Sequence, residues 1–136
     1  MIIADTSGLL AFFNRSEEAH DRVRAIVETE RDPLVVSPYV VAELDYLIAT
    51  RVGIDAELTV LNELASGAYL LAEFDRADLE KAIDVIAQYK DLGIGIADAS
   101  LVVLAERFNT QTILTLDRRH FGVLRPLAGD GFDLRP

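Results

Sequence analysis

A chain of 136 residues, 51% of them hydrophobic, is long enough to bury a core of its own and too apolar to be disordered. It contains no cysteine, which excludes disulfides, thiolate nucleophiles and zinc–sulfur sites. Its net charge of −10 argues against a simple nucleic-acid binder, which would carry a basic surface. The length predicts one domain that spans residues 1–136.

No apolar run approaches the roughly 20 residues needed to span a bilayer, and the N-terminal residues lack the basic flank and cleavage site of a secretion signal. We therefore expect a cytoplasmic protein without a membrane partner. The charge is unevenly spread: residues 32–98 carry thirteen acids and four bases, whereas residues 99–136 carry four acids and five bases. Three arginines of that last segment (Arg118, Arg119 and Arg125) are candidates for a basic edge on an otherwise acidic surface.

The first ten residues predict a strand, a tight turn and the start of a helix. Residues 2–4 form a short apolar run without polar alternation, which is typical of a buried parallel strand. Residues 5–8 (Asp-Thr-Ser-Gly) then separate this run from the next apolar stretch, residues 9–13. Because the ligand crevice of an open α/β sheet lies at the carboxyl ends of its strands, Asp5 is expected at the mouth of that crevice.

Further apolar runs alternate with amphipathic segments along the rest of the chain. Strand candidates lie at residues 34–36, 68–71 and 112–116, with a possible edge strand at 132–134. Helices are predicted between them from their caps and their 3.6-residue periodicity. The first is capped by Ser16, the second runs from Ser37-Pro38 to about Val52, and the third covers about 54–65. A fourth is opened by Asp75 and Asp78 at capping-box spacing, and a fifth begins at Asp98. This alternation predicts an α/β fold, a three-layer α/β/α sandwich around a central parallel sheet of four to five strands.

Four acidic residues are placed where a parallel sheet would bring them together. Asp5 and Asp117 each follow an apolar strand directly, and Asp98 begins the helix that leads into the fourth strand. Glu43 lies little more than one turn into the helix after the second strand, where we expect it to be half sheltered. Like charges at short range raise one another's pKa, and a bound divalent cation relieves that repulsion.

The donor types indicate which cation would bind. Oxygen-only ligation, with no cysteine and no histidine at helical ligand spacing, favours Mg²⁺ or alternatively Mn²⁺. Mg²⁺ contacts one or two carboxylates together with phosphate oxygens, which points to phosphoryl chemistry. The chain lacks the Asp-x-Asp after its first strand that haloacid-dehalogenase-like phosphatases need. It also lacks the late strand-end lysine of receiver domains, since Lys81 and Lys90 both fall in a predicted helix.

Four segments resemble the successive motifs of PIN-domain ribonucleases: Asp5-Thr6-Ser7, Ala42-Glu43-Leu44, Ile96-Ala97-Asp98-Ala99-Ser100 and Thr115-Leu116-Asp117-Arg118-Arg119. The size, the motif order and the approach Asp91-Leu92-Gly93 resemble most closely the VapC toxins of bacterial toxin–antitoxin pairs. The resemblance covers essentially the whole chain and fills all four acidic positions.

This resemblance implies a PIN-like fold and a Mg²⁺-dependent endoribonuclease, the toxin of a type II toxin–antitoxin pair, that hydrolyses RNA phosphodiester bonds. Asp5, Glu43, Asp98 and Asp117 would be the catalytic residues and would hold one or two cations. It also implies a homodimer blocked by a VapB antitoxin, whose C-terminal segment enters the active-site groove of the hetero-oligomer. Asp91 is a rival acid upstream of Asp98, and the sequence leaves open which of the two reaches the metal.

Three hydroxyl residues lie beside these acids. Thr6, Ser7 and Thr115 are candidates to orient carboxylates or bound waters, and they are equally suited to turn and capping roles.

Arg118 and Arg119 are candidates to bind RNA phosphates, and their alternative role is to neutralise Asp117 in the unliganded site.

Two other functions of the protein stay open. One is a non-catalytic PIN-like module that binds RNA or peptide in the same groove. The other is a DNA-directed metal nuclease, which would normally need helical insertions for which 136 residues leave little room.

Overall fold

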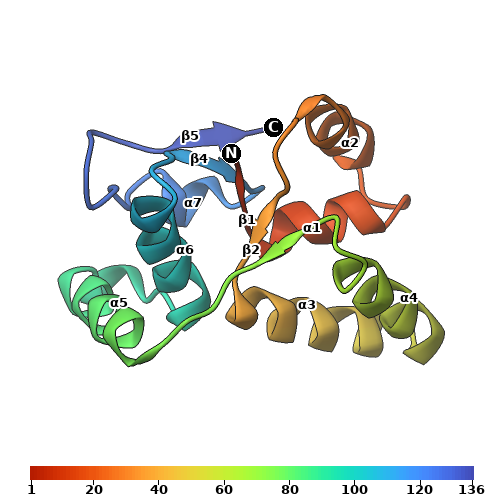
Figure 1. Ribbon diagram of the computed structural model, residues 1–136, viewed down its shortest axis with the longest axis horizontal. Helices are drawn as coiled ribbons and strands as arrows, with labels where there is room; N and C mark the ends of the chain where they lie inside the picture. The colour runs from red at the N-terminus through yellow and green to blue at the C-terminus, as the bar shows by residue number, and fades with distance from the viewer.

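Five short parallel strands form the central sheet of the computed structural model, which describes residues 1–136 (Figure 1). The sheet order is β3-β2-β1-β4-β5, and all four pairings are parallel. The strands are β1 (Ile3–Ala4), β2 (Val35–Val36), β3 (Leu70–Leu71), β4 (Thr112–Leu114) and β5 (Asp133–Arg135). The predicted α/β fold with a parallel sheet of four to five strands is confirmed.

Helices cover the sheet from two sides. They are α1 (Thr6–Phe13), α2 (His20–Thr29), α3 (Pro38–Arg51), α4 (Ile54–Leu64), α5 (Arg76–Gln88), α6 (Ile96–Arg107) and α7 (Arg118–Phe121), with a 3₁₀ turn η1 at Lys90–Leu92. Figure 1 shows α5 and α6 to the left of the strands and α1, α2 and α4 to their right. The sheet is therefore the middle of three layers, as predicted. None of the helices combines the length and the apolar character that a membrane-spanning segment requires.

The centre of the fold is mainly apolar. The four residues of β1 and β2 are completely buried, as expected for parallel strands covered on both faces. Helix α6 is also buried on every side, with each residue from Ala99 to Ala105 inside the core. Because α6 passes through the interior, its first turn brings Asp98 towards the sheet rather than towards the surface.

The order in which strands are added to the sheet reverses at β1. From β1 it moves outward to β2 and β3, and it then crosses back to add β4 and β5 on the opposite side of β1. The carboxyl ends of β1 and β4 therefore form the topological switch point, where open α/β sheets bind their ligands. Ala4 pairs with Leu114 in the register of these strands, so the next residues, Asp5 and Thr115, lie level at this edge.

Two predicted helix starts differ from the structure. Helix α1 begins at Thr6, directly after Asp5, so the segment read as a turn is already its first turn. Helix α2 begins at His20 and is not capped by Ser16. Asn14 holds that stretch in a turn instead, because its Oδ1 accepts from Ser16 N at 3.0 Å and its carbonyl accepts from Glu17 N at 3.1 Å.

Two other predicted starts are confirmed. Ser37 caps α3 by accepting from Tyr39 N at 3.2 Å, with Pro38 in the first helical position. Asp75 and Asp78 form a reciprocal capping box at the start of α5, with hydrogen bonds of 2.9 and 3.0 Å.

Helix α1 approaches β4 so closely that position 8 has no room for a side chain. A Cβ at Gly8 would overlap the backbone carbonyl of Leu114, whose oxygen also accepts from Asp5 N at 3.0 Å. A glycine-to-alanine change inside a helix normally gains about 1 kcal/mol, but here the overlap reverses the sign. We expect Gly8→Ala to lower the free energy of unfolding by about 1–3 kcal/mol, as measured by denaturant titration.

Gly131→Ala is the matched control, because a Cβ at that position meets nothing within 4 Å. Its free energy of unfolding should stay within about 0.5 kcal/mol of the wild-type value. Equal stability of the two variants would show that α1 has room to move away from β4.

Candidate active site

Asp5 is a buried carboxylate held by two hydroxyls. Its residue is only 5% exposed at the carboxyl end of β1. Ser7 Oγ donates to Asp5 Oδ2 at 2.9 Å, and Thr115 Oγ1 donates to the same oxygen at 2.7 Å. Desolvation raises the pKa of Asp5, these hydrogen bonds oppose that rise, and the charge of Glu43 adds to it. Both hydroxyls donate to Oδ2, so Oδ1 has no side-chain hydrogen-bond partner.

The same two hydroxyls tie Asp5 to the segment that follows β4. Ser7 Oγ accepts from Leu116 N and Thr115 Oγ1 accepts from Asp117 N, each at 2.9 Å. Each hydroxyl has one proton, and both protons go to Asp5. The position of Asp5 is therefore fixed by the chain that leads into Asp117, although 110 positions in the sequence separate Asp5 from Thr115.

Thr6 behaves differently from the other two hydroxyl residues. It is buried in the first turn of α1, and its Oγ1 has no hydrogen-bond partner in the protein. Of the three residues predicted to orient carboxylates or waters, Ser7 and Thr115 contact Asp5 through their hydroxyls and Thr6 does not. A buried hydroxyl without a partner is rare, and it leaves a polar atom available next to Asp5.

Asp98 is the second sheltered acid. It lies in the first turn of α6, and its side chain is 17% exposed. Desolvation raises its pKa to about 6, the charges of Asp5 and Asp117 add to the rise, and a hydrogen bond with His120 opposes it. Asp98 and Asp5 therefore lie near enough to repel each other.

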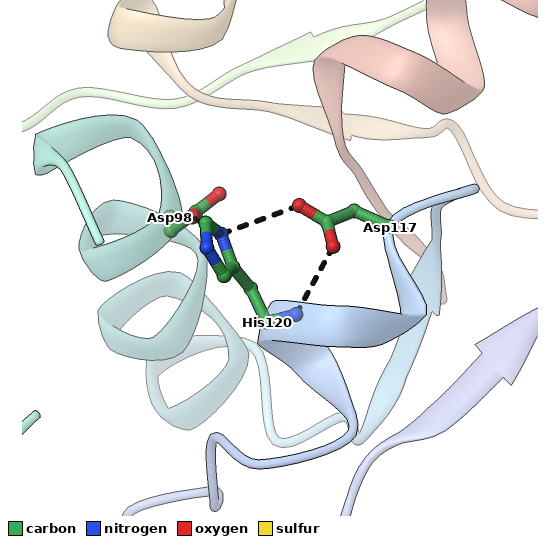
Figure 2. Close-up of side chains that lie close together, drawn as sticks. All are labelled: Asp98, Asp117 and His120. Carbon is green, nitrogen blue, oxygen red and sulfur yellow. Dashed lines mark hydrogen bonds and ion pairs between the residues drawn. The ribbon is translucent and has the colours of Figure 1, made fainter. Parts of the chain in front are cut away.

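Asp117 and His120 face Asp98 from α7 (Figure 2). Asp117 caps this short helix, since its Oδ1 accepts from His120 N at 3.0 Å. The imidazole Nδ1 of His120 lies 2.7 Å from Asp98 Oδ2 and 3.2 Å from Asp117 Oδ2. One ligand atom from each of these three residues lies within 4.8 Å of the others, so the group could hold a metal ion.

His120 is the residue that the sequence analysis missed, because the expected ligand set contained oxygen only. The sequence feature that could have indicated His120 as a site residue was its spacing of three residues from Asp117. Three residues along a helical turn return a side chain to the same face, so a helix capped by Asp117 directs His120 back towards it.

Glu43 lies on the rim of the site. It is exposed, and the expectation of a half-sheltered side chain was wrong. The buried stripe of α3 is Val40, Leu44 and Ile48, and Glu43 falls on its flank, where no element covers it. It lines an open hollow together with Tyr39 and Ala42 of α3, with Gly95, and with residues 96–98 at the start of α6.

The structure thus brings Asp98 and Asp117 into one group, places Asp5 beside Asp98, and leaves Glu43 across the hollow. The rival acid, Asp91, is exposed on η1 and is not part of the group that could hold a metal.

Both arginines of α7 are exposed. Arg118 Nη2 donates to the carbonyl of Pro136 at 2.6 Å, and Arg119 Nη2 lies 3.2 Å from His120 Nε2. Neither guanidinium forms an ion pair with Asp117, whose basic neighbour is His120. Their predicted alternative role, the neutralisation of Asp117, has no support in this geometry.

The chemistry of the donors fits a divalent cation. Carboxylate oxygens and an imidazole nitrogen converge at the switch point. Burial, with a smaller contribution from neighbouring negative charges, raises the pKa values of Asp5 and Asp98. A cation would relieve that repulsion. Such a centre suits metal-assisted hydrolysis, because no cysteine is present as an alternative nucleophile.

A family model described as the PIN domain matches residues 2–124. The chain belongs to the PIN-domain family, and the parallel sheet with its acidic switch point is the corresponding architecture. Over 135 residues it is 57% identical to Ribonuclease VapC26 of Mycobacterium tuberculosis (strain ATCC 25618 / H37Rv), a match that covers 99% of this chain and 100% of that one. Within the family its place is among the VapC proteins.

Two solved structures share the fold. The first is Mycobacterium tuberculosis VapC20, described as a sarcin–ricin loop cleaving toxin, with a TM-score of 0.82, 16% identity, and coverage of 95% of this chain and 100% of that one. The second is FitAcB from Neisseria gonorrhoeae, with a TM-score of 0.65, 22% identity, and coverage of 90% and 91%. At these identities the two structures establish the arrangement of elements, and it agrees with the predicted PIN-like fold.

Because the pKa of Asp98 is raised, the free energy of unfolding of the cation-free protein should depend on pH. The pKa in the folded protein, about 6, exceeds the unfolded value of about 3.9, so the unfolded chain releases this proton first as the pH rises. Stability therefore falls between about pH 4 and pH 6 and stays lower above that range. Asp98→Asn removes the buried charge, and we expect it to raise the free energy of unfolding by about 1–3 kcal/mol at about pH 7.5 in EDTA.

The same substitution should have little effect at about pH 4, where Asp98 is already protonated in the folded protein. Denaturant titrations at both pH values measure the difference, with Asp91→Asn as a control acid on the exposed turn η1. A gain that is the same at both pH values, or no gain at all, would mean that Asp98 is not the titrating group.

Proposed function

We propose that this chain is a divalent-cation-dependent endoribonuclease and that it acts as the toxin of a type II toxin–antitoxin pair. The observation that carries the proposal is the convergence of Asp98 and Asp117 beside the buried Asp5 at the switch point of the sheet. Identity of 57% along the whole chain with a protein named as a ribonuclease supports RNA as the substrate.

Asp5, Asp98 and Asp117 would hold the cation, with Glu43 acting from across the hollow. The group of ligands suits Mg²⁺, with Mn²⁺ as the alternative. When bound, the cation supplies a water of lowered pKa and stabilises the charge that develops on the phosphate.

The protein's own residues prepare the site for this chemistry. Ser7 and Thr115 fix Asp5 through its Oδ2, so that its other oxygen stays free of side-chain bonds. Asp98 is kept sheltered on the buried helix α6, where burial raises its pKa and a cationic partner would stabilise its charged form.

RNA would reach this centre over α7. Most of the chain is acidic and repels phosphate, but the exposed Arg118 and Arg119 lie on the helix that also carries His120. Each would contact backbone phosphates, and such contacts position a substrate without reading its sequence.

The partners are proposed from family membership. We propose a homodimer that binds a VapB-type antitoxin in a hetero-oligomer, with the C-terminal segment of the antitoxin entering the hollow beside Glu43. A cytoplasmic location follows from the proposed substrate and partner.

The central test is cleavage of total cellular RNA by the chain purified free of any partner. We expect cleavage that needs Mg²⁺ or Mn²⁺ and stops in EDTA, with Asp5→Asn and Asp98→Asn slower by at least about 100-fold because each removes a ligand charge. Asp130→Asn, an exposed acid between β4 and β5, is the matched control and should cleave at the wild-type rate.

The outcomes separate the alternative functions. Undiminished cleavage by Asp5→Asn would remove that residue from the site. Binding of RNA without hydrolysis would favour the non-catalytic module. Equal cleavage of matched DNA and RNA substrates would favour a DNA-directed nuclease.

A second test concerns the arginines of α7. Removing a phosphate contact weakens binding and lowers the dependence of binding on salt, with a change in slope of about 1 for each contact. We expect this result for Arg118→Gln and Arg119→Gln in titrations of the Asp5→Asn protein with RNA at several salt concentrations. Arg51→Gln, at the far end of α3 from the site, should leave both quantities unchanged. An unaltered slope in all three variants would place the RNA on another surface.

A further inference from the structure

His120 lies between the two carboxylates that converge from α6 and α7. We infer that it supplies an imidazole nitrogen to the cation of this site, and that this nitrogen shifts the selectivity of the site from Mg²⁺ towards Mn²⁺. The inference rests on the proposed function, because it names a further ligand of the same cation.

The distances around His120 suit a shared cation. Ligands at right angles around an ion with bonds of about 2.1 Å lie about 3.0 Å from one another. His120 Nδ1 is 2.7 Å from Asp98 Oδ2 and 3.2 Å from Asp117 Oδ2, and these two separations lie on either side of that value. Figure 2 shows the ring between the two carboxylates, with Nδ1 turned towards them.

The position of the imidazole is set by the fold. Asp117 Oδ1 accepts from His120 N, which closes the turn of α7. The next residue, Phe121, is fully buried and packs edge-on against Phe132 with a centroid separation of 6.1 Å. With only 15% of its side chain exposed, His120 has little freedom to leave the site.

We assign the tautomer from the contact with Arg119. A guanidinium can only donate hydrogen bonds, so the Nε2 that faces Arg119 Nη2 at 3.2 Å must offer its lone pair. Nδ1 then carries the proton, which bonds to Asp98 Oδ2.

Binding of a cation at Nδ1 would release that proton to solvent. Nε2 would take up a proton in exchange, and the ring would stay neutral. Nε2 would then no longer accept a hydrogen bond from Arg119, and the guanidinium would be free to contact a substrate phosphate.

The nitrogen donor matters for the choice of ion. Mg²⁺ prefers oxygen ligands, whereas Mn²⁺ suits carboxylates and, as a first-row transition ion, accepts an imidazole nitrogen more readily than Mg²⁺ does. A site with His120 as a ligand should therefore bind Mn²⁺ more tightly than Mg²⁺.

The test is pulsed electron paramagnetic resonance of the full chain loaded with Mn²⁺, which detects the coupling of a directly bound imidazole ¹⁴N. The chain has two histidines and no cysteine, so the assignment needs only two variants. His120→Asn keeps a hydrogen-bond donor for Asp98 but removes the imidazole. His20→Asn is the matched control, since His20 bonds to the carbonyl of Ala11 and lies outside the metal group.

We expect the ¹⁴N coupling in the wild-type and His20→Asn proteins and its loss in His120→Asn. Competition titrations should show Mn²⁺ preferred over Mg²⁺ by at least about tenfold in the wild type, and His120→Asn should reduce that preference by about tenfold.

The other outcomes overturn the inference in distinguishable ways. Mn²⁺ binding with RNA cleavage but without the coupling would leave the proposed function standing and remove His120 from the ligands. Coupling that persists in His120→Asn would have the same consequence for His120. Absence of both Mn²⁺ binding and cleavage would overturn the proposed function as well.

Discussion

The burial of Asp5 is the constraint on which the rest of the site depends. A carboxylate at the end of a central strand loses most of its hydration, and neighbouring acids increase the cost of its charge. Two hydroxyls offset part of that cost. Ser7 comes from the first turn of α1 and Thr115 directly follows β4, so their hydrogen bonds also tie the end of β1 to the segment after β4. The fold thus fixes one oxygen of Asp5 tightly while several negative charges converge beside it.

The strands and the acids at their ends could be predicted from the sequence, for a physical reason. Continuous apolar runs specify buried parallel strands, and a parallel sheet brings all their carboxyl ends to one edge. Asp5, Asp98 and Asp117 therefore follow from local pattern combined with topology. The start of α2 could not be predicted in this way, because the side chain of Asn14 competes with the apparent cap at Ser16.

The position of His120 and the exposure of Glu43 could not be predicted from sequence patterns. The role of His120 depends on a four-residue helix whose start is set by the carboxylate of Asp117, and so short a helix has no hydrophobic period to reveal it. The exposure of Glu43 depends on which elements cover the flank of α3, which is a property of packing rather than of α3 itself. Both residues border the site, and in each case the information that sets their position lies in a neighbouring element.

The burial of α6 gives the site one rigid wall, and the opposite wall carries exposed side chains. Helix α6 is enclosed on all sides, so Asp98 cannot shift without disturbing the core. Helix α7 opposite has four residues and carries exposed arginines. Substrates of different shape would therefore be accommodated by the exposed arginine side chains of α7, with α6 as the fixed reference. Substitutions should be tolerated at Arg118 and Arg119 of α7 far more readily than on the first turns of α6.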